Sequence, residues 1–201
     1  MNNQEKLIRF RNALLKFIEF DAAEWEIFCA HIQFSDLKKK EYFATEGKVC
    51  THMGFIASGG VRYYYLKDGV EITGYFSFEH DFVSSYKSFL TGEPCLNNIQ
   101  ALEETELILI SKDNIVALQN HPKLAYKMER FGRLMAEHYI CCYEDRVTAF
   151  ITQTAEERYL DMERTAKNIF QKIPQHYIAN FLGITPVSLS RIRKRTLLQK
   201  V

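Results

Sequence analysis

Gln175-His-Tyr-Ile-Ala-Asn-Phe-Leu-Gly-Ile-Thr-Pro-Val-Ser-Leu-Ser-Arg-Ile-Arg-Lys194 is the stretch that decides the architecture of this chain. Its first part places Ile178, Phe181 and Leu182 three and four positions apart, which is the spacing of one helix face. Gly183 permits a turn with positive φ, and Thr185 followed by Pro186 is a strong start for a second helix. These signals predict two short helices joined by a tight turn.

Two helices joined in this way form a helix-turn-helix, whose second helix enters the DNA major groove. An ordinary helical hairpin with a solvated basic face is the alternative. Residues 164–201 contain eight Lys or Arg and no Asp or Glu, whereas residues 1–163 contain 18 basic and 25 acidic residues. A basic module on an acidic body favours a polyanion partner for that module alone.

The composition of the whole chain is that of a globular protein. Its length of 201 residues is enough for one large or two small domains. Its residues are 47% hydrophobic and 25% charged, as is usual for globular domains. There is no apolar run of 18 residues, and Met1-Asn-Asn-Gln-Glu lacks a signal peptide's apolar core, so we expect a cytoplasmic protein without a membrane segment. The cysteines show no Cys-x-x-Cys spacing and predict reduced thiols rather than disulfides or zinc ligands: Cys29, Cys50, Cys95, Cys141 and Cys142.

Short β-rich runs separated by turn residues occupy about residues 43–110, after two expected helices over residues 3–20 and from Asp21 onward. Asp68-Gly69 predicts a hairpin turn, because both residues tolerate positive φ. Residues 99–102 and 106–110 are expected to pair with each other. Short strands at this spacing predict a small barrel or jelly roll.

A long helix is predicted over residues 122–150. Six residues recur at alternating spacings of four and three, the seam of a two-stranded coiled coil: Leu124, Met128, Phe131, Met135, His138 and Cys142. At ~1.5 Å per residue the helix is about 40 Å long, more than a small barrel covers. The sequence therefore predicts a homodimer built on this seam, with a lone helix lying on the barrel as the alternative.

These segments, in this order, resemble the Crp/Fnr family of transcription regulators. The resemblance rests on Glu46-Gly47-Lys48, Gly54-Phe-Ile-Ala-Ser-Gly-Gly-Val-Arg62, Asp81-Phe82-Val83 and the helix-turn-helix. It implies an α+β fold: a jelly-roll (double-stranded β-helix) domain of the cyclic-nucleotide-binding type with a helical lead-in over 1–121, a dimerisation helix over 122–150, and a winged-helix-like helix-turn-helix domain over 151–201. The implied partners are double-stranded DNA, a second copy and, for an activator, RNA polymerase.

The expected effector site departs from the cyclic-nucleotide binders of that family. Their Gly-Glu-Leu and Arg-Ser-Ala segments correspond here to Ser84-Ser85-Tyr86 and Cys95-Leu96-Asn97. A buried phosphate without a fixed cation is desolvated without compensation, so we expect no cyclic AMP binding. Scattered cysteines and isolated histidines likewise predict no iron–sulfur cluster, haem or other metal cofactor. The aromatic residues of the roll fit either its core or an apolar pocket, for which the candidates are Tyr63, Phe82, Val83, Ser84, Ser85 and Asn97.

Arg191 is the candidate base reader of the second helix, because Arg makes bidentate hydrogen bonds to guanine. Val187 and Ser188 are the secondary readers. The remaining candidates for DNA contact are helix-start and phosphate-binding residues: Thr185, Pro186, Ser190, Arg193, Lys194 and Arg195. Only residues 196–201 follow in this sequence, too few for the wing that is usual in the family.

Two other functions are compatible with parts of the sequence. A ligand-sensing or protein-interaction module without specific DNA binding would explain the missing wing. A cupin-type enzyme would need clustered metal ligands, whereas His52, His80 and His121 stand apart. We therefore expect no enzymatic activity.

Overall fold

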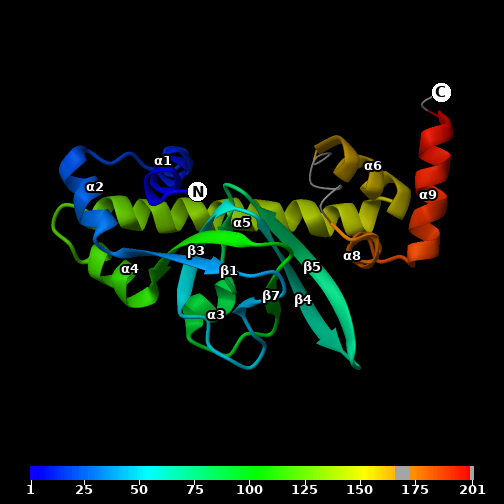
Figure 1. Ribbon diagram of the computed structural model, residues 1–201, viewed down its shortest axis with the longest axis horizontal. Helices are drawn as coiled ribbons and strands as arrows, with labels where there is room; N and C mark the ends of the chain where they lie inside the picture. The colour runs from blue at the N-terminus through cyan, green and yellow to red at the C-terminus, as the bar shows by residue number, and fades with distance from the viewer. Residues whose placement is uncertain (166–172, 200–201) are drawn as a thin grey trace.

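The 28-residue helix α5 (Ala125–Thr152) forms the long axis of the molecule (Figure 1). The computed structural model describes residues 1–165 and 173–199. The N-terminal helices lie beside the first part of α5, the β-roll lies along its middle, and α6, α8 and α9 lie at its carboxyl end (Figure 1). The predicted α+β class, with roll, long helix and C-terminal helices in that order, is confirmed.

Two N-terminal helices precede the roll, α1 (Asn3–Leu14) and α2 (Ala22–Cys29). Each begins in a capping box, in which Asn2 pairs with Glu5 and Asp21 pairs with Glu24, and this satisfies backbone N–H groups that have no helical acceptor. The helix expected over residues 3–20 is shorter than predicted, because it ends at Leu14.

The roll consists of two four-stranded antiparallel sheets. One has the order β1-β8-β3-β6 and the other β2-β7-β4-β5. The strands are β1 (Ile32–Leu37), β2 (Tyr42–Ala44), β3 (His52–Ser58), β4 (Gly60–Lys67), β5 (Val70–Phe78), β6 (Phe82–Val83), β7 (Asn98–Ala101) and β8 (Thr105–Ser111), with helices α3 (Tyr86–Thr91) and α4 (Lys112–Gln119) inserted between or after them.

The local turn prediction is confirmed, while one predicted strand pair is wrong. Asp68 (φ 53°) and Gly69 (φ 76°) join β4 to β5 in the expected hairpin. By contrast, β7 pairs with β2 and β4, whereas β8 pairs with β1 and β3. The chain crosses from one sheet to the other between β7 and β8, so these neighbours in sequence do not pair.

The predicted dimer seam on α5 is wrong for its first four residues. Leu124, Met128, Phe131 and Met135 are 0–7% exposed and belong to the core that α5 forms with α1, α2 and the roll. Side chains buried within one chain leave no surface for a second chain. His138 is exposed and Cys142 partly exposed, and the His138 ring lies 6.3 Å from that of Phe17, centroid to centroid.

The C-terminal helices are α6 (Ala155–Thr165), α8 (Gln175–Phe181) and α9 (Pro186–Gln199). Their small core includes Tyr159, Ile178, Leu189 and Ile192, and Phe76 of β5 extends it into the roll. Residues 196–199 are expected from the sequence to follow the second helix of the helix-turn-helix, but they continue that helix, α9. Residues 200–201 lie outside the described part of the chain. No helix in the described part combines the length and apolar character needed to cross a membrane.

Candidate effector cavity and nucleic-acid interface

The turn between α8 and α9 is built from the residues that the sequence indicated. Gly183 has φ 72°, a conformation that costs glycine nothing. Thr185 Oγ1 accepts a hydrogen bond from the backbone N–H of Ser188 (3.1 Å) and so caps α9. Leu189 and Ile192 face inward against α8, which fixes the two helices as one unit.

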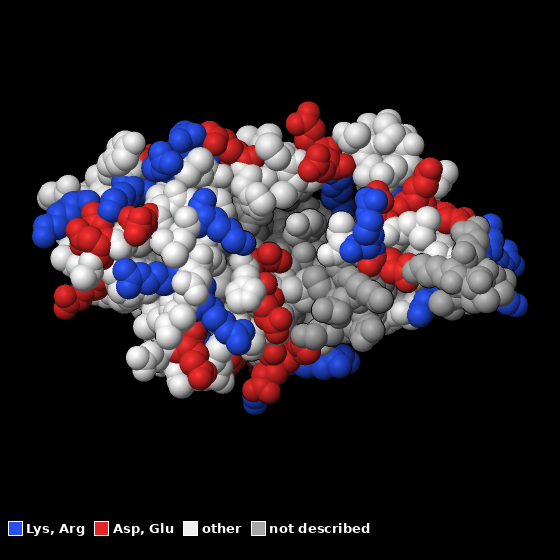
Figure 2. Space-filling model, turned by 90° about the horizontal axis from the view of Figure 1, so that it is seen from above, with Lys and Arg blue, Asp and Glu red and all other residues white. Residues whose placement is uncertain are grey.

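The outward face of α9 carries four of the nine predicted DNA-contacting residues. Val187, Ser190, Arg191 and Lys194 recur at helical spacing and are exposed, opposite the buried stripe of the helix. Figure 2 shows Lys and Arg side chains at the end of the molecule that α9 forms, on the right of the view. A basic helix face is therefore open to a partner at this end.

The other predicted DNA-contacting residues are less alike in their surroundings. Thr185 and Pro186 are exposed at the start of α9, and Arg193 is exposed beside the buried stripe. Ser188 is partly buried, and its hydroxyl lies 3.0 Å from that of Thr185. Arg195 Nη2 lies 2.6 Å from Glu156 Oε2 of α6, so its charge is already paired within the chain.

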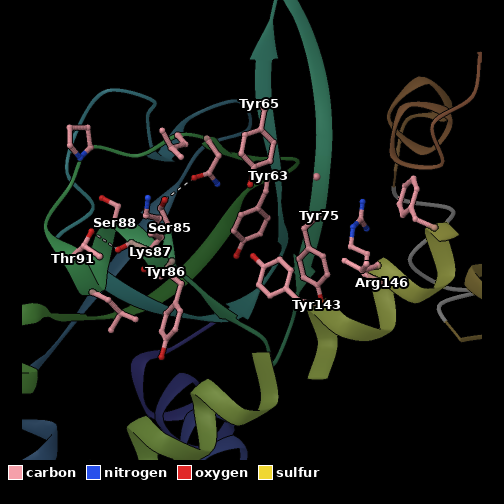
Figure 3. Close-up of a pocket in the computed structure, with 18 of the residues that line it drawn as sticks. Tyr63, Tyr65, Tyr75, Ser85, Tyr86, Lys87, Ser88, Thr91, Tyr143 and Arg146 are labelled. Carbon is pink, nitrogen blue, oxygen red and sulfur yellow. Dashed lines mark hydrogen bonds between the residues drawn. The ribbon is translucent and has the colours of Figure 1, made fainter. Parts of the chain in front are cut away.

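A cavity of about 730 Å³ lies between the roll and the second half of α5. Its walls come from β4, β5, α3 and α5, and Figure 3 shows Tyr63, Tyr75, Tyr86 and Tyr143 around the same space. Burial raises the pKa of each of these phenols, to about 12 for Tyr75. The hydroxyls therefore stay protonated at neutral pH and can donate hydrogen bonds.

Four of the six predicted pocket residues line this cavity: Tyr63, Ser84, Ser85 and Asn97. Phe82 and Val83 do not, which corrects that part of the prediction. The Phe82 ring packs in the core 5.7 Å from Phe55 and Phe131, centroid to centroid, and Val83 is fully buried. Both residues of β6 are thus used for packing.

The cavity end beside α3 carries hydroxyl and amide groups that are bonded to the chain itself. Ser85 Oγ donates to Asn97 Oδ1 (2.7 Å), and Ser84 Oγ donates to the backbone oxygen of His52 (3.1 Å). Cys95 is buried in the core. Ser84, Ser85, Cys95 and Asn97 thus supply neither a carboxylate for a ribose nor a cation for a cyclic phosphate.

The described residues lining the cavity include only two charged side chains, Lys87 and Arg146. Lys87 is exposed, and its Nζ lies 3.2 Å from Glu93 Oε2. Arg146 is partly buried on α5, and its guanidinium carbon lies 4.0 Å from the centroid of the Phe181 ring of α8. Desolvation lowers the pKa of this guanidinium.

Helix α8 is docked on the β4–β5 hairpin by contacts that the sequence did not indicate. The Thr73 backbone N–H donates to Asn180 Oδ1, and Asn180 Nδ2 donates to the Glu71 carbonyl oxygen (2.8 Å). Arg62 is 2% exposed and its guanidinium carbon lies 3.9 Å from the Tyr177 ring centroid. Nothing local in the sequence distinguishes these side chains from surface residues.

Comparison with known proteins defines the class of the roll. Residues 34–121 match the family model of the cyclic nucleotide-binding domain. No curated protein matches the chain in sequence.

Solved structures extend the likeness to the C-terminal helices. FixK2 from Bradyrhizobium japonicum is 20% identical, with 85% of this chain and 86% of that one covered and a TM-score of 0.65. The c-di-GMP responsive global regulator CLP of Xanthomonas campestris is 14% identical (90% and 93% covered, TM-score 0.69). A Crp/Fnr-family transcriptional regulator from Eubacterium rectale is 20% identical (94% and 88% covered, TM-score 0.64). The chain is thus a Crp/Fnr-like protein in its fold.

Proposed function

We propose that this protein is a homodimeric, sequence-specific DNA-binding transcription regulator of the Crp/Fnr type. The observation that carries the proposal is the outward face of α9. Arg191 and Lys194 project there without an acidic partner among the described residues, from a helix that Leu189 and Ile192 anchor to α8. A rigid helix with an exposed basic face suits entry into the major groove.

Within α9 we assign different roles to neighbouring residues. Arg191 reads a base and Val187, one turn before it, contacts a thymine methyl group. Lys194 and Ser190 hold phosphates, which positions the helix without selecting a sequence. Thr185 and Ser188 form the helix start, and Arg195 adds less because Glu156 neutralises it.

A binding-site selection followed by titration of the selected duplex tests these roles. Arg191→Ala should cost about 1–3 kcal/mol and relax the preference at one base position in each half-site. Lys194→Ala should weaken all duplexes alike and lower the slope of log K against log salt by about one. Equal losses on every sequence for both variants would remove Arg191 as the reader.

The second copy of the chain is proposed to pair along the carboxyl half of α5. Exposed apolar side chains recur there every three or four residues: Ile140 (65% exposed), Tyr143 (63%), Val147 (55%) and Ile151 (78%). This spacing is that of a helix seam, and these side chains stay more than half exposed although Tyr143, Val147 and Ile151 also line the open cavity. Two copies paired along it would form a two-fold dimer, which predicts a near-palindromic DNA site with half-sites ~34 Å apart.

Sedimentation measurements on a matched pair of variants test the dimer. Val147→Glu combined with Ile151→Glu places two charges in the seam and should give monomers. Thr148→Glu adds a charge at an exposed position of the same helix, about 100° around from Val147, and should leave the dimer intact. A double variant that still sediments as a dimer at micromolar concentration contradicts this interface.

The roll is proposed as a sensory domain without enzymatic activity, whose ligand is not cyclic AMP, iron–sulfur, haem or another metal cofactor. The hydroxyl and amide groups at its α3 end support this, because Ser84 and Ser85 are bonded within the chain. If the regulator activates transcription, RNA polymerase is a further partner.

The second candidate function is a ligand-sensing or interaction module that does not recognise DNA specifically. The pairing of Arg195 with Glu156 favours it, since one cation of α9 is withdrawn. Selection that yields no preferred sequence, with only weak and strongly salt-dependent binding, would establish it.

A further inference from the structure

Arg146 lies between the roll and the C-terminal helices, where it borders two cavities. It lies on α5, where it lines the large cavity and also a second cavity of about 270 Å³ between α5, α6 and α8. Its guanidinium rests over Phe181 at 4.0 Å and near Phe150 at 5.2 Å, measured from the guanidinium carbon to each ring centroid. It therefore forms part of the wall between the two cavities.

No carboxylate neutralises this guanidinium within the described chain. The described ion pairs involve other arginines and lysines, and Arg146 makes none of the described hydrogen bonds. Aromatic faces partly compensate a cation, but they leave the N–H edges of the guanidinium without acceptors. Since desolvation already lowers its pKa, an anion beside these edges would be favoured.

The rest of the cavity lining indicates what the uncharged part of such an anion should be. The cavity walls are largely tyrosine rings and aliphatic side chains, including Leu90, Leu96, Val147 and Ile151. The phenol groups of Tyr75 and Tyr143, whose pKa values burial raises, remain protonated at neutral pH and can donate hydrogen bonds. Figure 3 shows Tyr75, Tyr143 and Arg146 along one side of the space. An apolar volume with one fixed cation at its edge is typical of a site for a small amphiphilic molecule.

We propose that the cavity binds a small aromatic or aliphatic monocarboxylate, whose carboxylate pairs with Arg146 and whose apolar body lies among the tyrosines. This inference rests on the proposed sensory role of the roll and names its ligand class. A planar guanidinium fork matches a carboxylate in two parallel hydrogen bonds. A phosphate with more charge would find no second free cation there, because Lys87 is exposed and paired with Glu93.

The site also explains how a ligand would reach α8. Arg146 lies on Phe181, whose ring is 5.3 Å from that of Phe76 in β5, centroid to centroid. A carboxylate on the guanidinium changes the charge that faces Phe181, so occupancy of the cavity and docking of α8 share one side chain. Because such coupling is reciprocal, a change at either site is felt at the other.

Calorimetric titration of the protein with a matched pair of probes tests the site. The acid 1-naphthylacetate and its neutral analogue 1-naphthylacetamide have the same apolar body and differ in charge. We expect the acid to bind at least tenfold more tightly, and Arg146→Gln to abolish that difference while leaving amide binding within about twofold. Lys87→Gln removes the other charge of the lining and should leave the tenfold preference in place.

Arg146→Lys keeps the charge without the planar fork and serves as the second variant if Arg146→Gln does not fold. It should retain a preference for the acid that is smaller than tenfold. The proposal is overturned if acid and amide bind equally to the unaltered protein, if Arg146→Gln keeps the full preference, or if neither probe binds at millimolar concentration. Because no DNA is present, failure here leaves the proposed DNA recognition standing.

Discussion

Asn180 of α8 is the residue whose removal should most specifically release the C-terminal helices from the roll. Its side-chain amide bridges two backbone groups of β5, accepting from the Thr73 N–H and donating to the Glu71 carbonyl. The edge of the hairpin is thus completed by a side chain instead of a strand. Asn180→Ala removes both bonds and adds no steric conflict.

The size of the effect follows from what each lost bond contributes. A typical hydrogen bond contributes about 0.5–1.5 kcal/mol net, so the two together stabilise docking by about 1–3 kcal/mol. Thr73 is a buried residue of β5, and its N–H would need water in place of the amide oxygen. At 1.4 kcal/mol per factor of ten, local opening should become about 5- to 150-fold more frequent.

Hydrogen exchange of the Thr73 amide measures this opening directly. Its protection should fall by that factor in Asn180→Ala, while amides of β3 in the roll interior keep theirs. Gln175→Ala provides the matched control, since Gln175 is an exposed residue of the same helix. An unchanged Thr73 protection in a folded Asn180→Ala protein would falsify the view that this amide holds α8 in place.

Three further predictions concern stability. Met135→Ala should lower the free energy of unfolding of the monomer by about 2–5 kcal/mol in denaturant titration, because the side chain is 1% exposed within one chain. A loss of dimer association alone, with monomer stability unchanged, would contradict its place in the core. Gly183→Ala should lower the free energy of unfolding by about 1–2 kcal/mol because of its positive φ, whereas Gly132→Ala in α5, with open space around it, should raise it by up to ~1 kcal/mol. Thermal unfolding of both variants checks these opposite signs. The hydrogen bond from Lys127 holds the pKa of Glu24 below its ordinary 4.5, so this group stabilises the fold above pH 4.5 and loses that effect as the pH falls through its folded value. Glu24→Gln should therefore flatten the fall in stability below pH 4.5, and an unchanged slope of the acid titration would remove this pair as its cause.

Part of the candidate site could be predicted from the sequence, and part of it could not. The outward residues of α9 follow from helix period and capping, which are local, and Thr185, Val187 and Arg191 lie where the sequence placed them. The cavity residues Tyr143 and Arg146 come from α5, more than 40 positions after the roll segments that the sequence indicated. No pattern within a short window connects such positions.

Local chemistry is what the sequence determined by itself. A glycine with positive φ before Thr185-Pro186 ends one helix and starts the next, and Asp68-Gly69 closes a hairpin, because each depends on the backbone preferences of adjacent residues. Only the tertiary structure decided which face of α5 is buried, since Met128 and Met135 show the same period against their own core as against a second copy. It also decided that β7 and β8 enter different sheets and that Asn180 completes the edge of β5, because these pairings depend on which distant segments burial brings together.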